Sequence, residues 1–115
     1  MIEKIILDHL SDHLSQEVYM ENPTPLPDSY VLIEKTGSSK RNQINTATIA
    51  VQSYSTSMYG AAALNEEVKT CMDQLISNNQ IARVELETDY NFTNTATKQY
   101  RYQAVYNITY YTEVQ

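Results

Sequence analysis

The spacing of apolar residues predicts two helices in this chain of 115 residues. In residues 2–14, apolar side chains recur on one side of a helix drawn at about 100° per residue, and polar side chains fall on the other side. A second, longer apolar stripe runs through residues 58–76. Three hydroxyl residues at 55–57 precede it as typical N-caps, and the polar residues 77–79 end it.

Alternation of apolar and polar residues predicts the strands. They are residues 30–36, 44–54, 81–90 and 97–111, with a short extended segment at 18–20. The first two strands flank a polar loop, Gly37–Asn42, and the last two flank a polar turn, Asn91–Ala96, so each pair is expected to form a hairpin. Three prolines within Asn22–Asp28 forbid a helix there and predict a stiff, extended connector.

This order of elements predicts one α+β domain spanning residues 1–115. A helix, a short strand, a hairpin, a long helix and a second hairpin follow one another, in the order α-β-β-β-α-β-β. Two helices packed on one face of a mostly antiparallel sheet form a two-layer domain. The length is close to the commonest domain size, and a hydrophobic fraction of 42% is ordinary for a protein with one core.

Charge and cysteine content narrow the possible classes of function. A net charge of −6 disfavours sequence-independent binding of phosphate backbones, which requires clustered lysine and arginine. A single cysteine, Cys71, excludes an internal disulfide and is typical of a reducing compartment. No stretch approaches the ~20 apolar residues of a membrane span. We also find no long apolar region typical of a signal peptide at the N-terminus.

No constellation of residues predicts catalysis, a metal site or a cofactor. His9 and His13 are four apart on the first predicted helix, but the zinc-protease pattern requires a glutamate where this chain has Leu10. A histidine pair at the boundary of the apolar side is therefore favoured over a metal site. Cys71 falls in the apolar stripe of the long helix, where thiols are usually inert. With two glycines, the chain has no glycine-rich phosphate-binding loop, and we expect no enzyme.

Tyrosines and carboxylates are the remaining unusual features. The chain has ten tyrosines, and half of them lie in the last predicted strand and the tail. Tyrosine is enriched at protein interfaces, and an aromatic sheet face outside the core indicates a partner. Stacking of nucleic-acid bases on that face would require a basic groove, which the charge does not supply. Glu85, Glu87 and Asp89 alternate along one predicted strand and are expected to form a solvated or pore-lining acidic face.

Several segments together resemble a family of bacteriophage proteins. Tyr30–Gly37 follows the Pro-rich connector, Ile44–Tyr54 leads into Ala62–Val68, and Asp89–Phe92 precedes the Tyr-rich last strand. Over nearly the whole chain, these features resemble tail terminator, or tail-completion, proteins of tailed phages and prophages of Gram-positive bacteria. The resemblance rests on element order, length and strand sequence, and the family has no catalytic residues to carry over.

The resemblance implies a ring-forming α+β subunit, typically in a hexamer, that caps the tail tube and joins it to the head connector. The implied partners are further copies of the chain, the tail tube protein and head–tail connector proteins, with no membrane and no cofactor. DNA would pass through the lumen without being bound specifically. The implied location is the virion, and the host cytoplasm during assembly.

Mapped onto this chain, the resemblance predicts contacts at loops and edges. The expected contacts between rings are Ser38, Ser39, Lys40 and Arg41, together with the turn Asn91–Ala96. The expected seam between subunits contains Tyr100, Tyr102 and Tyr106, and the expected acidic lumen contains Glu85, Glu87 and Asp89. Two alternatives stay open. One is another head–tail connector or minor capsid component, and the other is a small binding module that uses the Tyr-rich sheet face.

Overall fold

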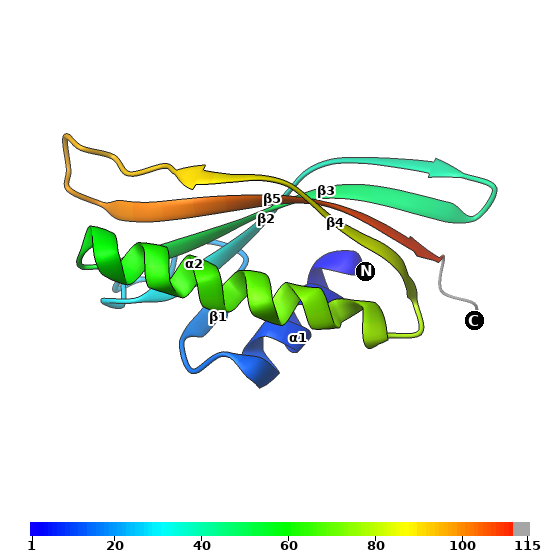
Figure 1. Ribbon diagram of the computed structural model, residues 1–115, viewed down its shortest axis with the longest axis horizontal. Helices are drawn as coiled ribbons and strands as arrows, with labels where there is room; N and C mark the ends of the chain where they lie inside the picture. The colour runs from blue at the N-terminus through cyan, green and yellow to red at the C-terminus, as the bar shows by residue number, and fades with distance from the viewer. Residues whose placement is uncertain (112–115) are drawn as a thin grey trace.

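In the computed structural model, which describes residues 1–111, two helices lie on one face of a five-stranded sheet (Figure 1). In chain order the elements are α1 (Ile2–His13), β1 (Glu17–Tyr19), β2 (Tyr30–Arg41), β3 (Ile44–Ser55), α2 (Met58–Asp73), the 3-10 turn η1 (Gln74–Ser77), β4 (Ile81–Asn91) and β5 (Tyr100–Tyr111). The predicted α+β class and the predicted order of helices and strands are confirmed.

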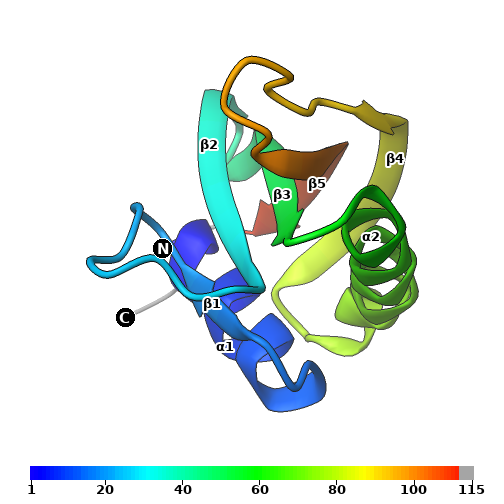
Figure 2. The same cartoon turned by 90° about the vertical axis from the view of Figure 1, so that its left-hand side faces the viewer.

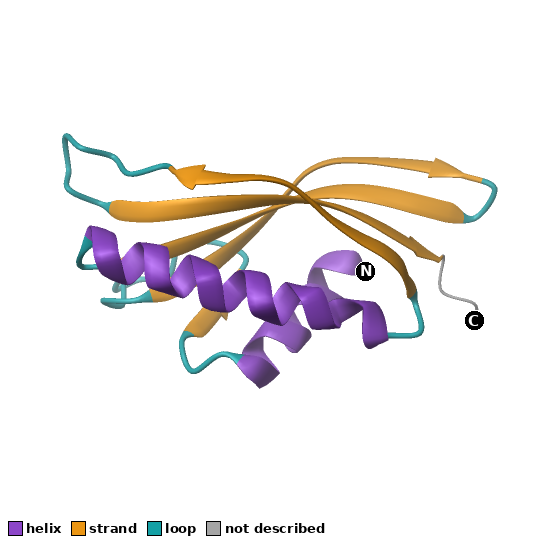
Figure 3. Cartoon of the chain, in the orientation of Figure 1, coloured by secondary structure: helices purple, strands orange, loops and turns teal. Residues whose placement is uncertain are grey.

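The strands lie in the order β1-β2-β3-β5-β4. β1 pairs with β2 in parallel, and every other neighbouring pair is antiparallel. The sheet is longer than the helical layer, so the β2–β3 hairpin projects past the helices as an arm (Figure 3). The molecule is correspondingly elongated, with principal extents of 45 × 24 × 23 Å.

The core fills the space between the sheet and the two helices, which lie beneath the same sheet face when the molecule is seen end on (Figure 2). Each helix contributes the apolar stripe that its sequence predicts, because residues three and four apart share one face. The fully buried side chains include Ile2, Ile6 and Leu10 of α1, Val68 and Met72 of α2, and Ile33, Ile49, Val51, Tyr106 and Ile108 of the sheet. α2 begins at a Ser57 cap, whose Oγ accepts a hydrogen bond from the Gly60 amide at 2.9 Å.

The segment predicted as a polar loop, Gly37–Asn42, is largely a strand. β2 stays paired with β3 as far as Arg41 and Ile44, which leaves a turn of two residues, Asn42 and Gln43. Both have positive φ, 52° and 66°, as a type I′ hairpin turn requires, and asparagine adopts this conformation readily. Polar composition was misleading because an arm that projects beyond the core needs no apolar face.

The last strand begins at Tyr100, three residues later than the predicted Thr97. Lys98 has a φ of 54°, which is incompatible with an extended strand. An isolated bridge between Asn94 and Gln99 closes the connection between β4 and β5.

Candidate assembly surface

Both edges of the sheet present unpaired backbone within residues 1–111. β4 is one edge and pairs only with β5. At the other edge, β1 covers β2 only from Tyr30 to Leu32, so from Ile33 to Arg41 no described strand lies on the side of β2 away from β3. Unpaired N–H and C=O groups along an edge strand form a template for pairing with another chain. We call these two stretches the β4 edge and the free β2 edge.

The β4 edge and the free β2 edge lie level with each other across the sheet. Leu86 of β4 pairs with Tyr106 of β5, which pairs with Ile49 of β3. Ile49 in turn pairs with Lys35 of β2, so Leu86 and Lys35 occupy the same height at opposite edges. Three antiparallel pairings separate the two edge strands, so they run in opposite directions. A second copy that placed its β4 beside β2 would continue the antiparallel order of the sheet.

The two edges carry opposite charge. The β4 edge contains three carboxylates and one guanidinium: Glu85, Glu87, Asp89 and Arg83. The free β2 edge contains three cations and one carboxylate: Lys35, Lys40, Arg41 and Glu34. Lys40 and Arg41 are exposed and have no ion-pair partner among the described residues. At equal height, Lys35 lies opposite Leu86, between Glu85 and Glu87, and this opposition of charge favours a contact there, whereas Lys40 lies at the height of Ile81. Charged edges also disfavour pairing with unrelated sheets.

The residues predicted to form subunit contacts lie in separate parts of the sheet. Ser38–Arg41 is exposed on the β2–β3 arm. Tyr100 and Tyr102 are half-buried at the start of β5, which is the opposite end of the sheet (Figure 1). Tyr102 lines a small pocket against α2 together with Tyr59. The tyrosines predicted for the subunit seam and the residues of the β2–β3 arm therefore do not form one continuous surface.

Tyr106 lies in the core, which corrects its predicted place in a subunit seam. Its side chain is 1% exposed. It shares its face of β5 with Ala104 and Ile108, which are both fully buried, because this face is the one that meets the helices. Burial raises the pKa of the Tyr106 hydroxyl well above its usual range, so the group stays neutral. The hydroxyl has no hydrogen-bond partner among the described residues.

Replacing Tyr106 with phenylalanine is expected to raise the unfolding free energy by about 1 kcal/mol, because it removes a buried hydroxyl that lacks a partner. Urea denaturation measures the change. Tyr54→Phe is the matched control, because the Tyr54 hydroxyl donates to Gln52 Oε1 at 2.6 Å and accepts from Arg101 at 3.1 Å. That variant should lose roughly 1–3 kcal/mol. A comparable loss in Tyr106→Phe would show that its hydroxyl is paired.

A β-bulge separates Asp89 from the other two residues predicted for the acidic lumen. The register of β4 against β5 shifts between Leu86 and Thr88, and a shift of one residue moves the later side chains to the opposite face. Asp89 therefore faces α2. It accepts a hydrogen bond from Asn65 Nδ2 at 3.2 Å and lies 3.4 Å from Lys69 Nζ. Strict alternation along the sequence does not reveal the bulge, so the prediction of one shared acidic face is corrected.

The sheet face away from the helices, here called the open face, is polar at its centre and carries Glu85 and Glu87. At one end of the same face, Tyr30, Leu32 and Tyr54 form a small buried apolar cluster. Glu87 accepts a hydrogen bond from Asn107 Nδ2 at 2.5 Å, and Asn107 Oδ1 accepts one from Thr48 Oγ1 at 2.9 Å. A further amide–amide hydrogen bond of 2.7 Å joins β3 and β5 on the same face. Carboxylates, amides and hydroxyls therefore cover the centre of the open face.

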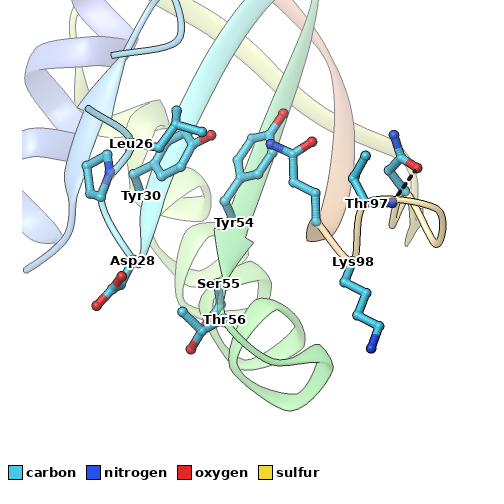
Figure 4. Close-up of a pocket in the computed structure, with 11 residues that line it drawn as sticks. Leu26, Asp28, Tyr30, Tyr54, Ser55, Thr56, Thr97 and Lys98 are labelled. Atoms are coloured by element: carbon cyan, nitrogen blue, oxygen red, sulfur yellow. Dashed lines mark hydrogen bonds between the residues drawn. The ribbon is translucent and has the colours of Figure 1, made fainter. Parts of the chain in front are cut away.

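A pocket of about 510 Å³ lies where the Pro-rich connector meets the turn that precedes β5 (Figure 4). Tyr30 and Tyr54 line it with parallel rings whose centroids are 4.5 Å apart. Leu26 lies beside Tyr30, while Asp28 and Lys98 stand on opposite walls (Figure 4). Sequence reasoning missed this pocket because its walls come from distant segments. The sequence did contain one signal. Tyr30 and Tyr54 lie nearly the same number of residues before and after the β2–β3 turn, which places them opposite each other in the hairpin.

Comparisons of this chain with protein-family models and with curated proteins find no match. Within residues 1–111, neither helix is long and apolar enough to cross a membrane. Function must therefore be inferred from the residues themselves and from the way that the fold places them.

Proposed function

We propose that the chain is the subunit of a closed homo-oligomeric ring that serves as a structural tail-assembly protein of a phage or prophage. The observation that carries the proposal is the pair of unpaired, level and oppositely charged strand edges. A contact that joins the β4 edge of one subunit to the free β2 edge of the next subunit is a head-to-tail contact. Such contacts close into a ring when the rotation between subunits divides a full turn, and closure leaves no edge free.

In such a ring, one face of the sheet would line the lumen, and we assign this role to the open face. The helices would then lie on the outside. Glu85 and Glu87 on the open face support an acidic lumen, and the net charge of −6 has the same sign. An acidic wall repels phosphate backbones, so DNA would pass through the ring without being held.

Within the tail-assembly class, the resemblance of the strand segments supports a tail terminator. In that role the ring binds the end of the tail tube, stops its growth and offers a docking surface to the head connector. The β2–β3 arm with Ser38–Arg41 and the turn Asn91–Ala96 project from opposite ends of the molecule (Figure 1). One end could thus meet the tube protein and the other the connector, and a hexamer is the expected stoichiometry.

Deleting the gene from the phage or prophage that encodes it distinguishes a terminator from another connector component. Without a terminator, tails should have irregular and excessive lengths and should remain separate from filled heads. Without a head-completion protein, tails should keep one uniform length and only the attachment should fail. Electron microscopy of the lysate reads out both properties, and infectious particles of normal appearance would contradict either role.

A small binding module is the second candidate function, and the pocket beside the stacked Tyr30–Tyr54 pair is the observation that favours it. Both rings are themselves buried, so a ligand would be held by the exposed lining of the pocket, which includes Leu26 and Lys98. A gel-shift experiment with single-stranded DNA at low salt tests the nucleic-acid version. Retention by the wild-type chain that Lys98→Glu, at an exposed position of the pocket lining, removes would support binding, and free migration of the wild-type chain would exclude it.

A further inference from the structure

The contact between α1 and α2 brings together three side chains that bind transition metals. His9 and His13 lie one turn apart on α1, and Cys71 lies near the end of α2. One imidazole nitrogen from each histidine and the Sγ of Cys71 all lie within 4.8 Å of one another. The ligand atoms of a tetrahedral zinc ion are roughly 3.3–3.8 Å apart, given metal–ligand distances of about 2.0–2.3 Å. The separations in this chain reach beyond that spacing, so side-chain rotations would have to bring the three groups together around an ion.

Two hydrogen bonds hold the imidazole rings in place. The His9 Nε2 lies 2.8 Å from the carbonyl oxygen of Cys71, and the His13 Nδ1 lies 2.7 Å from the carbonyl oxygen of His9. A carbonyl oxygen only accepts, so each of these nitrogens is the N–H donor. In a neutral imidazole the lone pair then lies on the other nitrogen, which is Nδ1 of His9 and Nε2 of His13. A backbone carbonyl that accepts the second N–H is the usual support of a metal-bound histidine.

The surroundings allow an ion to enter and to be retained. A pocket of about 500 Å³ opens onto His13 and Cys71, and Glu66 and Glu67 line the same pocket. Glu67 adds negative charge near the site, whereas Glu66 lies 3.0 Å from Lys69 Nζ and is already paired. Cys71 is buried, and a metal ion that bound its sulfur would have to displace the thiol proton.

We propose that His9, His13 and Cys71 form a site for one transition-metal ion of the zinc class. Two imidazoles and one thiolate suit Zn²⁺ and its substitute Co²⁺, whereas Mg²⁺ and Ca²⁺ require oxygen ligands. The fourth position would hold water. The site would tie the N-terminal helix to α2, and it uses none of the residues of the two strand edges.

Titration of the purified full chain with Co²⁺ tests this site, because the visible spectrum of Co²⁺ reports its ligands and geometry. We expect one equivalent to bind, with the intense bands of a tetrahedral ion and a sulfur-to-cobalt charge-transfer band, and Zn²⁺ to displace it. Zn²⁺ should also raise the melting temperature of the chain, because a ligand that binds only the folded state stabilises that state.

Three variants separate coordination from loss of fold. His13 is exposed, so His13→Gln should fold normally and should weaken binding by more than the roughly 10- to 100-fold that loss of an outer-shell partner costs. Cys71→Ala should abolish the charge-transfer band. Asp12→Asn, at an exposed carboxylate on the same turn of α1, should leave stoichiometry and spectrum unchanged. Absence of the band in the wild-type chain, or equal Co²⁺ binding by His13→Gln, would overturn the proposal.

Discussion

Reversing the charge of the β4 edge is expected to prevent self-assembly. The double substitution Glu85→Lys/Glu87→Lys makes this edge positive, like the free β2 edge that we propose as its partner. Like charges brought together across an interface oppose association. Self-association should weaken at least about tenfold, which corresponds to roughly 1.4 kcal/mol. Sedimentation velocity at low ionic strength measures the effect, because surface charges are least screened there.

A second substitution makes the experiment specific to the two edges. Lys35→Glu, at the height of Leu86 on the facing edge, should disrupt assembly in the same way, and combining all three substitutions should restore it. An equimolar mixture of the two disrupted proteins should also assemble, because every contact would then join opposite charges. The control variant Glu21→Lys/Asp28→Lys changes the net charge of the chain by the same amount as Glu85→Lys/Glu87→Lys does. Both of its positions are exposed and lie outside the two strand edges, so it should have no effect on assembly. Failure of both restoring combinations would contradict pairing of these edges.

Truncating Ile6 to alanine is expected to lower the unfolding free energy by about 2–5 kcal/mol. Ile6 is 0% exposed and lies in the core between α1 and the sheet, so the substitution leaves a cavity. The control is Ile76→Ala, because Ile76 is 49% exposed and its loss should change stability by at most about 0.5 kcal/mol. Urea denaturation at one fixed protein concentration gives both values, since self-association also stabilises the folded chain. Equal losses would contradict the packing of α1 on the sheet.

Elements that bury one face could be predicted from the sequence, because burial imposes a periodic pattern. The stripe that includes Leu64, Val68 and Met72 predicted α2, and alternation predicted the centre of β3 around Ile49 and Val51. The end of β2 escaped prediction because the β2–β3 arm is exposed and carries no such pattern. Its position depends on the Asn42–Gln43 turn, which a polar composition conceals.

The candidate sites could not be fully predicted, because they depend on packing between elements, on a β-bulge and on the docking of two helices. Alternation placed Tyr102 and Tyr106 on one face, but only packing determines that this face meets the helices. The bulge that turns Asp89 toward α2 inserts one unpaired residue and leaves no clear signature in the composition. His9 and Cys71 are 62 residues apart, so their contact arises only from the docking of the two helices.

The absolute mass of the purified chain in solution shows most directly whether the chain forms a closed ring. Light scattering across a concentration series should detect one species of fixed mass, near 79 kDa for six copies of a 13.2 kDa chain. A fixed mass of several subunits would support a closed ring and would make the two strand edges the next residues to change. A mass of 13.2 kDa at every concentration, or a mass that grows without limit, would contradict self-assembly into a closed ring.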